Sequence, residues 1–171
     1  MTVITTERLI LTPHAAEDFT ALSRLWANPD FTCQIGLPVM SPETVWFRLL
    51  RDIGHWQVFG YGNWAIRQKG DDTYLGSVGL FHYRRDMEPA VDMPEVGWGL
   101  DPAVHGKGFG REAVAAALAH ADHDLRINRA FCMIDPRNAP SLKLGAGAGF
   151  VPAGEVTYKG EQANLLVRTR P

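Results

Sequence analysis

The stretch of sequence that decides the fold is EVGWGLDPAVHGKGFGREA, which runs from Glu95 to Ala113. Its first part, residues 95–100, predicts a short strand. From Phe109 onward, apolar side chains recur at three- and four-residue spacing, which predicts a helix over residues 109–125. The turn between them carries glycines at positions 106, 108 and 110, which allow close approach to the backbone. Because a helix N-terminus has unpaired N–H groups and partial positive charge, this turn predicts a site for a phosphate or pyrophosphate.

Two further glycines, Gly97 and Gly99, lie inside the predicted strand. Glycine weakens a strand, and it often marks a bulge or a place where another group comes close to the backbone. We therefore expect something to lie against the backbone of this strand.

The composition indicates a globular protein with one domain over residues 1–171. Of its 171 residues, 46% are hydrophobic and 21% are charged, which suffices for a single hydrophobic core. The formal net charge of −2 argues against a nucleic-acid binder, which needs a basic excess. No apolar run reaches the ~18 residues of a membrane span, and residues 1–8 lack a signal-peptide pattern. We expect a cytoplasmic location, no membrane association and no disulfide framework from Cys33 and Cys132.

Outward from the glycine turn, the predicted elements mix strands and helices without regular alternation. Strands are expected over residues 7–13, 63–68, 74–83, 95–100 and 130–134, and in a hairpin after residue 151 that turns at 159–160. Helices are expected over residues 15–26, 41–53, 109–125 and 140–148. Residues 84–94 are polar and contain proline, which predicts a loop. About seven strands and about four helices in this mixed order predict an α+β fold, or a mixed-sheet α/β fold.

Two common phosphate-binding patterns fit the turn poorly. A Walker-type loop needs Ser or Thr after the lysine, whereas Lys107 is followed by Gly108. A dinucleotide fingerprint needs the spacing G-x-G-x-x-G and an acidic residue after the next strand, whereas this turn reads G-x-G-x-G. A nucleotide-phosphate binder stays open as a third function class, and it predicts that ATP or NAD competes for the site.

The turn His105-Gly-Lys-Gly-Phe-Gly110 resembles the pyrophosphate loop of the GCN5-related N-acetyltransferase (GNAT) family. Asn138-Ala-Pro-Ser141, followed by Gly149-Phe150, resembles the later motif of that family. The flanks of the turn and the opening Thr6-Glu-Arg-Leu-Ile-Leu-Thr-Pro13 resemble the branch that acetylates ribosomal-protein N-termini. This resemblance implies a mostly antiparallel, twisted sheet that splays between its fourth and fifth strands.

The resemblance also implies the residues of the site. Glu95 is expected to act as the general base through a water, with Glu161 as the rival base, and Ser141 as the acid for the leaving thiolate. The backbone of Trp98 and Leu100 is expected to pair with the pantetheine arm. In full, the residues implied to bind the cofactor are Trp98, Leu100, His105, Gly106, Lys107, Gly108, Phe109, Gly110, Arg111, Asn138 and Ser141.

Three positions depart from the pattern of the family. His105 replaces a glutamine or arginine, and Thr12 stands where the ribosomal branch commonly has arginine. Gly145 lies where many members have a tyrosine that protonates the thiolate, which leaves this role to Ser141 or to no protein group. Because backbone amides do most of the phosphate binding, the change at His105 is expected to leave that binding intact.

The function implied is an acetyl-CoA-dependent N-acetyltransferase that uses no metal. Transfer is expected to be direct, because Cys33 and Cys132 lie outside both motifs and offer no cysteine nucleophile there. The acceptor is an amine of a small molecule or of a protein N-terminus, and homodimer formation stays open. The competing function is a non-catalytic acyl-CoA-binding sensor or binding module with the same fold.

Overall fold

The computed structural model describes residues 2–171. Within that range, nine strands form one sheet in the order β1-β2-β3-β4-β6-β7-β9-β8-β5. The strands are β1 (Ile4–Thr5), β2 (Leu9–Pro13), β3 (Asn63–Gln68), β4 (Tyr74–Phe81), β5 (Met87–Glu88), β6 (Glu95–Leu100), β7 (Arg129–Ile134), β8 (Val151–Tyr158) and β9 (Glu161–Thr169). The α-helices are α1 (Phe19–Trp26), α2 (Pro29–Thr32), α3 (Pro42–Phe59), α4 (Phe109–His123) and α5 (Ala139–Gly147). Neighbouring strands are antiparallel except β6 and β7, which are parallel.

The predicted α+β class and the mostly antiparallel sheet are confirmed, but the expected number of strands and helices is too low. The additional elements are β1, β5 and α2, which have two, two and four residues. Elements this short carry no readable hydrophobic period. Strand β5 lies inside the segment predicted as a loop, where Met87 and Glu88 pair with Tyr158 and Thr157 of β8.

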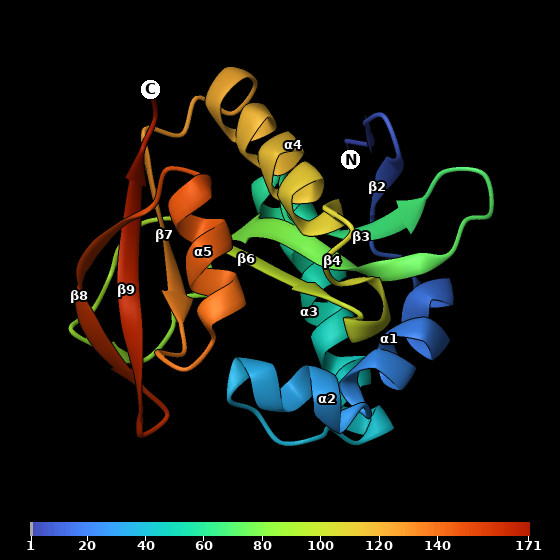
Figure 1. Cartoon of the computed structure of the whole chain (residues 1–171), viewed down its shortest axis with the longest axis horizontal. Helices are drawn as coiled ribbons and strands as arrows, with labels where there is room; N and C mark the ends of the chain where they lie inside the picture. The colour runs from blue at the N-terminus through green and yellow to red at the C-terminus, as the bar shows by residue number, and fades with distance from the viewer. Residues whose placement is uncertain (1) are drawn as a thin grey trace.

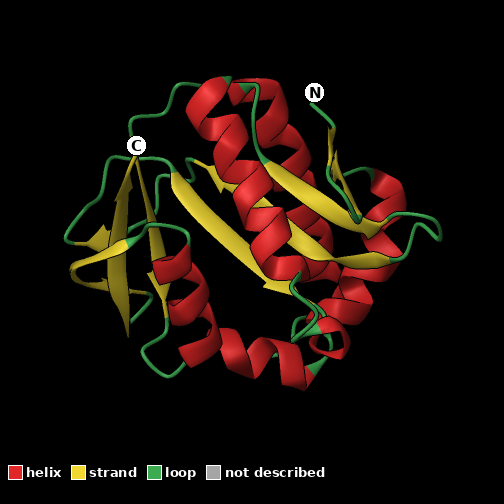
Figure 2. Cartoon of the chain, turned by 45° about the horizontal axis from the view of Figure 1, so that its top comes forward, coloured by secondary structure: helices red, strands yellow, loops and turns green. Residues whose placement is uncertain are grey.

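Helices cover both faces of the sheet (Figures 1 and 2). On one face, α4 buries Val114 and Ala117 in a core with Leu9, Trp64 and Val96 of the sheet. On the other face, α1 and α3 pack together over β3 in a second core, whose buried members include Leu22, Leu25, Val45, Leu49 and Ala65. None of the helices in residues 2–171 is long and apolar enough to span a membrane.

Strands β6 and β7 separate along most of their length, which confirms the splay between the fourth and fifth predicted strands. Their register contains the single pair Glu95 and Phe131, next to a hydrogen bond from Phe131 N–H to the Pro94 carbonyl at 3.0 Å. On its other side, β6 pairs with β4 over its whole length, from Glu95 to Leu100. Beyond Glu95, the edge of β6 that faces β7 therefore has no strand partner within the described residues.

The close approach predicted at Gly97 and Gly99 is made by aromatic side chains of the chain itself. A Cβ built on Gly97 would lie 2.6 Å from Cζ of Phe81, and one on Gly99 would lie 3.0 Å from the ring of Phe31. Successive residues of a strand point to opposite faces, so Glu95, Gly97 and Gly99 share one face. Because Phe31 belongs to α2, that face is the one covered by α1, α2 and α3.

We expect the substitution Gly97→Ala to destabilise the protein by about 1–3 kcal/mol, because the added methyl group would overlap the Phe81 ring. That ring cannot move freely, since it stacks on Tyr83 with ring centroids 4.4 Å apart. Urea unfolding measures the change. As the control, Gly54→Ala in α3 has nothing within 4 Å of the added Cβ, and it should raise stability by about 0.5–1 kcal/mol. Equal changes in the two variants would contradict this account of packing.

Candidate active site

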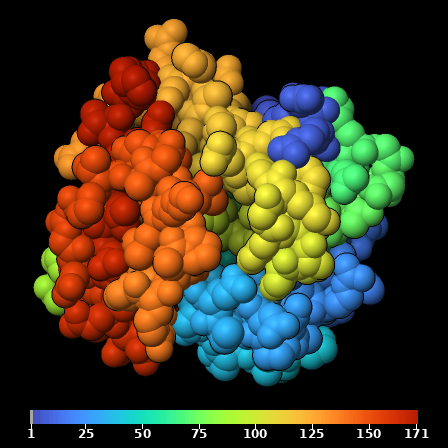
Figure 3. Space-filling view, viewed as in Figure 1, coloured from blue at the N-terminus to red at the C-terminus, as the bar shows by residue number. Residues whose placement is uncertain are grey.

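The space-filling view shows a hollow between α5 and the turn that precedes α4 (Figure 3). Three elements converge beside it. A Cβ on Gly110 of α4 would lie 3.4 Å from Cδ2 of Leu144 in α5 and 3.6 Å from Cδ1 of Leu100 in β6. The structure therefore brings the first turn of α4, the end of β6 and α5 together, as the sequence motifs predict.

The glycine turn has the backbone conformation that its sequence predicts. Gly106 and Gly108 have φ angles of 75° and 81°, in the left-handed region that favours glycine. A Cβ on Gly106 would meet nothing within 4 Å, so the space in front of this turn is open. Gly108 is the N-cap of α4 and provides no side-chain cap for the first-turn N–H groups. These donors and the exposed Lys107 fit an anionic phosphate group.

The side chain of His105 is held by its own chain. Its Nε2 lies 3.0 Å from the carbonyl oxygen of Leu100. This contact connects the end of β6 to the turn and helps to fix the turn relative to the splayed edge. Whether His105 also contacts a cofactor stays a prediction.

Residues between β1 and β2 also hold the turn in place, and the sequence did not reveal this contact. Arg8 donates from Nη1 to the Lys107 carbonyl at 2.9 Å, and its guanidinium lies 4.7 Å from the centre of the Phe109 ring. Nε of Arg8 also donates to Oε2 of Glu112 at 2.7 Å, while Thr6 donates to Oε1 of Glu112 at 2.6 Å. Burial works to raise the pKa of Glu112, but the hydrogen bonds from Thr6 and Arg8 outweigh it and hold that pKa below its ordinary value.

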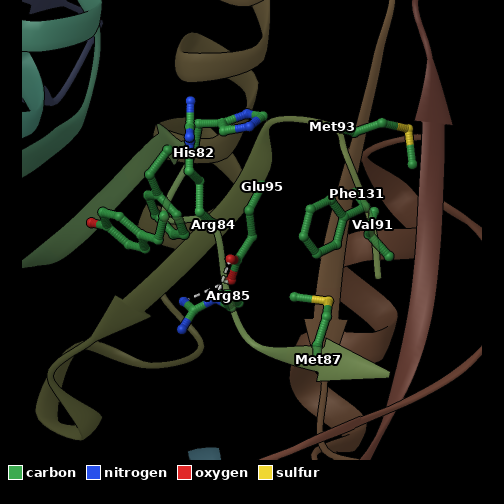
Figure 4. Close-up of a pocket in the computed structure, with 10 residues that line it drawn as sticks. His82, Arg84, Arg85, Met87, Val91, Met93, Glu95 and Phe131 are labelled. Carbon is green, nitrogen blue, oxygen red and sulfur yellow. Dashed lines mark hydrogen bonds and ion pairs between the residues drawn. The ribbon is translucent and has the colours of Figure 1, made fainter. Parts of the chain in front are cut away.

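Glu95 lies at the point where β6 and β7 begin to separate, and its carboxylate is buried. Arg85 donates to it twice, from Nε to Oε2 at 2.5 Å and from Nη2 to Oε1 at 3.1 Å (Figure 4). Nη1 of Arg85 donates to the Tyr158 hydroxyl of β8 at 3.0 Å. Burial raises the pKa of Glu95 above its ordinary value, and the opposing effect of Arg85 is smaller.

A small cavity of about 20 Å³ adjoins Glu95. Its lining combines apolar side chains, among them Met87, Met93 and Phe131, with the basic side chains of His82, Arg84 and Arg85 (Figure 4). This volume has room for one water molecule. The rival carboxylate, Glu161, is instead exposed at the start of β9.

Asn138 and Ser141 lie at the start of α5. Oδ1 of Asn138 caps the helix by accepting from Ser141 N–H at 3.1 Å, and its Nδ2 donates to the Gln34 carbonyl at 2.6 Å. Asn138 therefore fixes α5 to the segment that follows α2. The Ser141 side chain is half-buried, and within residues 2–171 its hydroxyl makes no hydrogen bond.

Gly145, where the family resemblance implies a tyrosine in many members, lies beside the indole of Trp98. A Cβ on Gly145 would lie 3.5 Å from Cη2 of Trp98 and 3.4 Å from Cδ1 of Ile134. Both distances are ordinary van der Waals contacts. Trp98 of β6 and Ile134 of β7 therefore pack directly against this position of α5.

The two cysteines differ in their exposure to solvent. Cys33 is exposed, whereas Cys132 is buried in β7. Burial, with a smaller contribution from the charge of Glu95, raises the pKa of the Cys132 thiol to about 12. A thiol held in its neutral form is a poor nucleophile.

The splayed mixed sheet and the glycine turn between β6 and α4 are the two structural features that the sequence resemblance implies. The sequence profile described as "Acetyltransferase (GNAT) domain" matches residues 8–151, and the chain belongs to the GNAT family of acetyltransferases. The N-acetyltransferase p20 of Bacillus licheniformis is 27% identical over 155 residues, which cover 90% of this chain and 85% of that protein.

Solved structures agree with this assignment. A GnaT-family acetyltransferase from Bordetella pertussis is 28% identical and superposes with a TM-score of 0.88, over 99% of this chain and 100% of that one. A ribosomal L7/L12 α-N-protein acetyltransferase in complex with coenzyme A is 18% identical and has a TM-score of 0.79, over 99% and 98% of the two chains. The resemblance to the ribosomal branch is thus confirmed for the fold, and the chain is an acyltransferase.

We expect Arg8→Ala to weaken coenzyme A binding about tenfold, because the turn loses a charge-assisted bond to the Lys107 carbonyl. Titration calorimetry with coenzyme A measures the dissociation constant. Arg129→Ala, which removes an exposed arginine from the start of β7, is the control and should leave that constant unchanged. Unaltered affinity in Arg8→Ala would show that the turn does not depend on this contact.

Proposed function

We propose that the chain transfers the acetyl group of acetyl-CoA directly to a primary amine within a ternary complex. One observation carries the proposal: Glu95 lies where β6 and β7 separate, the unpaired edge of β6 runs on from there to Leu100, and the glycine turn follows before α4. A buried carboxylate, an extended backbone edge and a turn suited to phosphate, in this order along the chain, match what acetyl transfer from a long thioester requires.

In this proposal, the turn holds the pyrophosphate through backbone N–H groups of residues 106–111, with Lys107 and Arg111 at the rim. The backbone of Trp98 and Leu100 pairs with the pantetheine arm along the unpaired edge of β6. The acetyl thioester is the chemical group that acetyl-CoA supplies. Asn138 positions the start of α5, since both ends of its side-chain amide already bond within the chain.

Glu95 acts as the general base through one water in the adjoining cavity. The acceptor nitrogen forms a bond to the acetyl carbon, the bond from that carbon to sulfur breaks, and the proton of the amine passes to Glu95. Ser141 donates a proton from its otherwise unbonded hydroxyl to the departing thiolate. It regains a proton from solvent, and Glu95 releases the proton of the amine to solvent, so both groups return to their starting states. The high pKa of Cys132 supports direct transfer rather than an acetyl-cysteine intermediate.

A thiol-release assay with acetyl-CoA tests this function against small amines, polyamines, amino acids and peptides with free N-termini. We expect release that depends on the amine, with one acetylated product per thiol by mass spectrometry. The ribosomal-protein acetyltransferases among the structural relatives favour peptides in this panel. Coenzyme A binding without turnover on any amine would favour the binding-module alternative, and competition by ATP or NAD would favour a nucleotide site.

We expect Glu95→Gln to lower kcat/KM for the acceptor about 10²–10⁴-fold, the contribution typical of a positioned general base. Because the base works as a carboxylate, activity falls as the pH drops through the pKa of Glu95, which lies above its ordinary value. In the wild type, protonation of Glu95 and protonation of the acceptor amine should each lower the activity as the pH falls. In Glu95→Gln, only the fall caused by protonation of the amine should remain.

Two matched variants complete this test. Glu155→Gln, an exposed change in β8, should leave both the rate and its pH dependence unchanged. Glu161→Gln addresses the rival base. Loss of the carboxylate-dependent fall in Glu161→Gln, with that fall retained in Glu95→Gln, would reassign the base to Glu161.

A further inference from the structure

Three guanidinium groups gather beside Glu95 on the face of the sheet that α3 covers. Arg48 and Arg51 are three residues apart in α3, so they lie on adjacent turns of one helix face, and Arg85 follows β4. Glu95 shares its face of β6 with Gly99, whose neighbour is Phe31 of α2, so the carboxylate points to this same side. The Tyr83 ring connects the helix to the carboxylate: Cζ of Arg51 lies 4.0 Å and Cζ of Arg85 lies 5.3 Å from its centre, and Arg85 bonds to Glu95.

Two of these three cations have a carboxylate partner. Arg51 bonds to Asp52, with Nη2 2.7 Å from Oδ1, and Arg85 holds Glu95. Asp52 is itself fully engaged, since it also accepts from Tyr83 at 2.6 Å. Within residues 2–171, Arg48 has neither an ion pair nor a hydrogen bond. The cluster therefore has one positive charge more than its carboxylates neutralise.

The position of Arg48 leaves its guanidinium stacked rather than paired. Its Cζ lies 4.0 Å from the centre of the buried Trp26 ring at the end of α1. Burial, with a further contribution from Arg51, lowers the pKa of Arg48 to about 10, so the group remains charged at neutral pH. A cation–π contact supplies less stabilisation than a hydrogen-bonded ion pair, and all N–H donors of Arg48 stay free.

The uncompensated charge also affects which acceptors can approach Glu95. A simple amine is an ammonium ion at neutral pH, and the cluster of guanidinium groups repels it. An acceptor that also carries a negative group is attracted by the same cluster. One excess positive charge matches one monoanion, and the planar guanidinium matches the two oxygens of a carboxylate.

We propose that the acceptor amine carries a carboxylate, which Arg48 binds beside Trp26 while the amine lies at Glu95. This inference rests on the proposed function and specifies its substrate class. The carboxylate has two sources with the same chemistry, a small amino acid or the acidic side chain of a peptide. The test has one arm for each.

Matched acceptor pairs that differ only in charge provide this test. The small-molecule arm compares 4-aminobutyrate with 4-aminobutyramide, and the peptide arm compares Ser-Asp-Ala-amide with Ser-Asn-Ala-amide. We expect wild type to prefer the carboxylate member at least tenfold in kcat/KM in one of the arms. Arg48→Gln should abolish this preference without changing the KM for acetyl-CoA, whereas Arg48→Lys, which keeps the charge, should retain part of it.

The control is Arg24→Gln, which removes an exposed arginine from α1 and should keep the full preference. Circular dichroism and thermal melting confirm that each variant is folded. Equal use of the charged and neutral members by wild type would overturn the proposal. A preference that survives in Arg48→Gln would do the same.

A binding measurement separates this inference from the proposed function. With coenzyme A present, 4-aminobutyrate or the Ser-Asp peptide should raise the melting temperature of wild type more than its neutral partner, and Arg48→Gln should lose this difference. This readout needs no turnover, so it decides the role of Arg48 even if every amine fails as a substrate. Failure of turnover with a carboxylate-dependent shift would reject the acetyl transfer alone, and the absence of both would reject both.

Discussion

The rest of the structure depends on the separation of β6 from β7, because it leaves one backbone edge without a partner inside the fold. An edge of this kind is stable only if other groups take up its hydrogen bonds or if solvent reaches it. Trp98 of β6 packs against α5, and Asn138 at the start of α5 donates a hydrogen bond to the Gln34 carbonyl. Gly36 makes this junction possible, since a Cβ there would lie 2.7 Å from Oδ2 of Asp135.

The net charge of the chain is close to zero, but its charged groups are distributed unevenly over the two faces of the sheet. On the face with α4 and α5, oriented backbone N–H groups of the glycine turn are suited to phosphate and require little excess of lysine or arginine. On the other face, Arg48, Arg51 and Arg85 concentrate positive charge around Glu95. A net charge of −2 for the whole chain conceals this local excess, so overall charge says little about what either site binds.

Sequence reasoning succeeded where a local pattern determines local structure. Strands β3 and β6 have the predicted bounds, and α4 begins at Phe109 as expected, because glycine and apolar spacing act over a few residues. It failed for contacts between distant segments. Arg8 and Glu112 are 104 residues apart, and Arg85 lies in a polar segment whose composition indicates only a loop. The identity of the aromatic rings against Gly97 and Gly99 likewise required the fold, although the glycines themselves indicated a close approach.

We propose that the unpaired edge of β6 and the glycine turn together bind the cofactor. Hydrogen exchange of individual backbone amides, with and without coenzyme A, measures this most directly. We predict slower exchange on binding for the amides of Trp98 and Leu100 and of residues 106–111, while amides of β3, which is paired on both sides, stay unchanged. Coenzyme A binding that leaves exchange in β6 and in the turn unaltered would contradict this proposal.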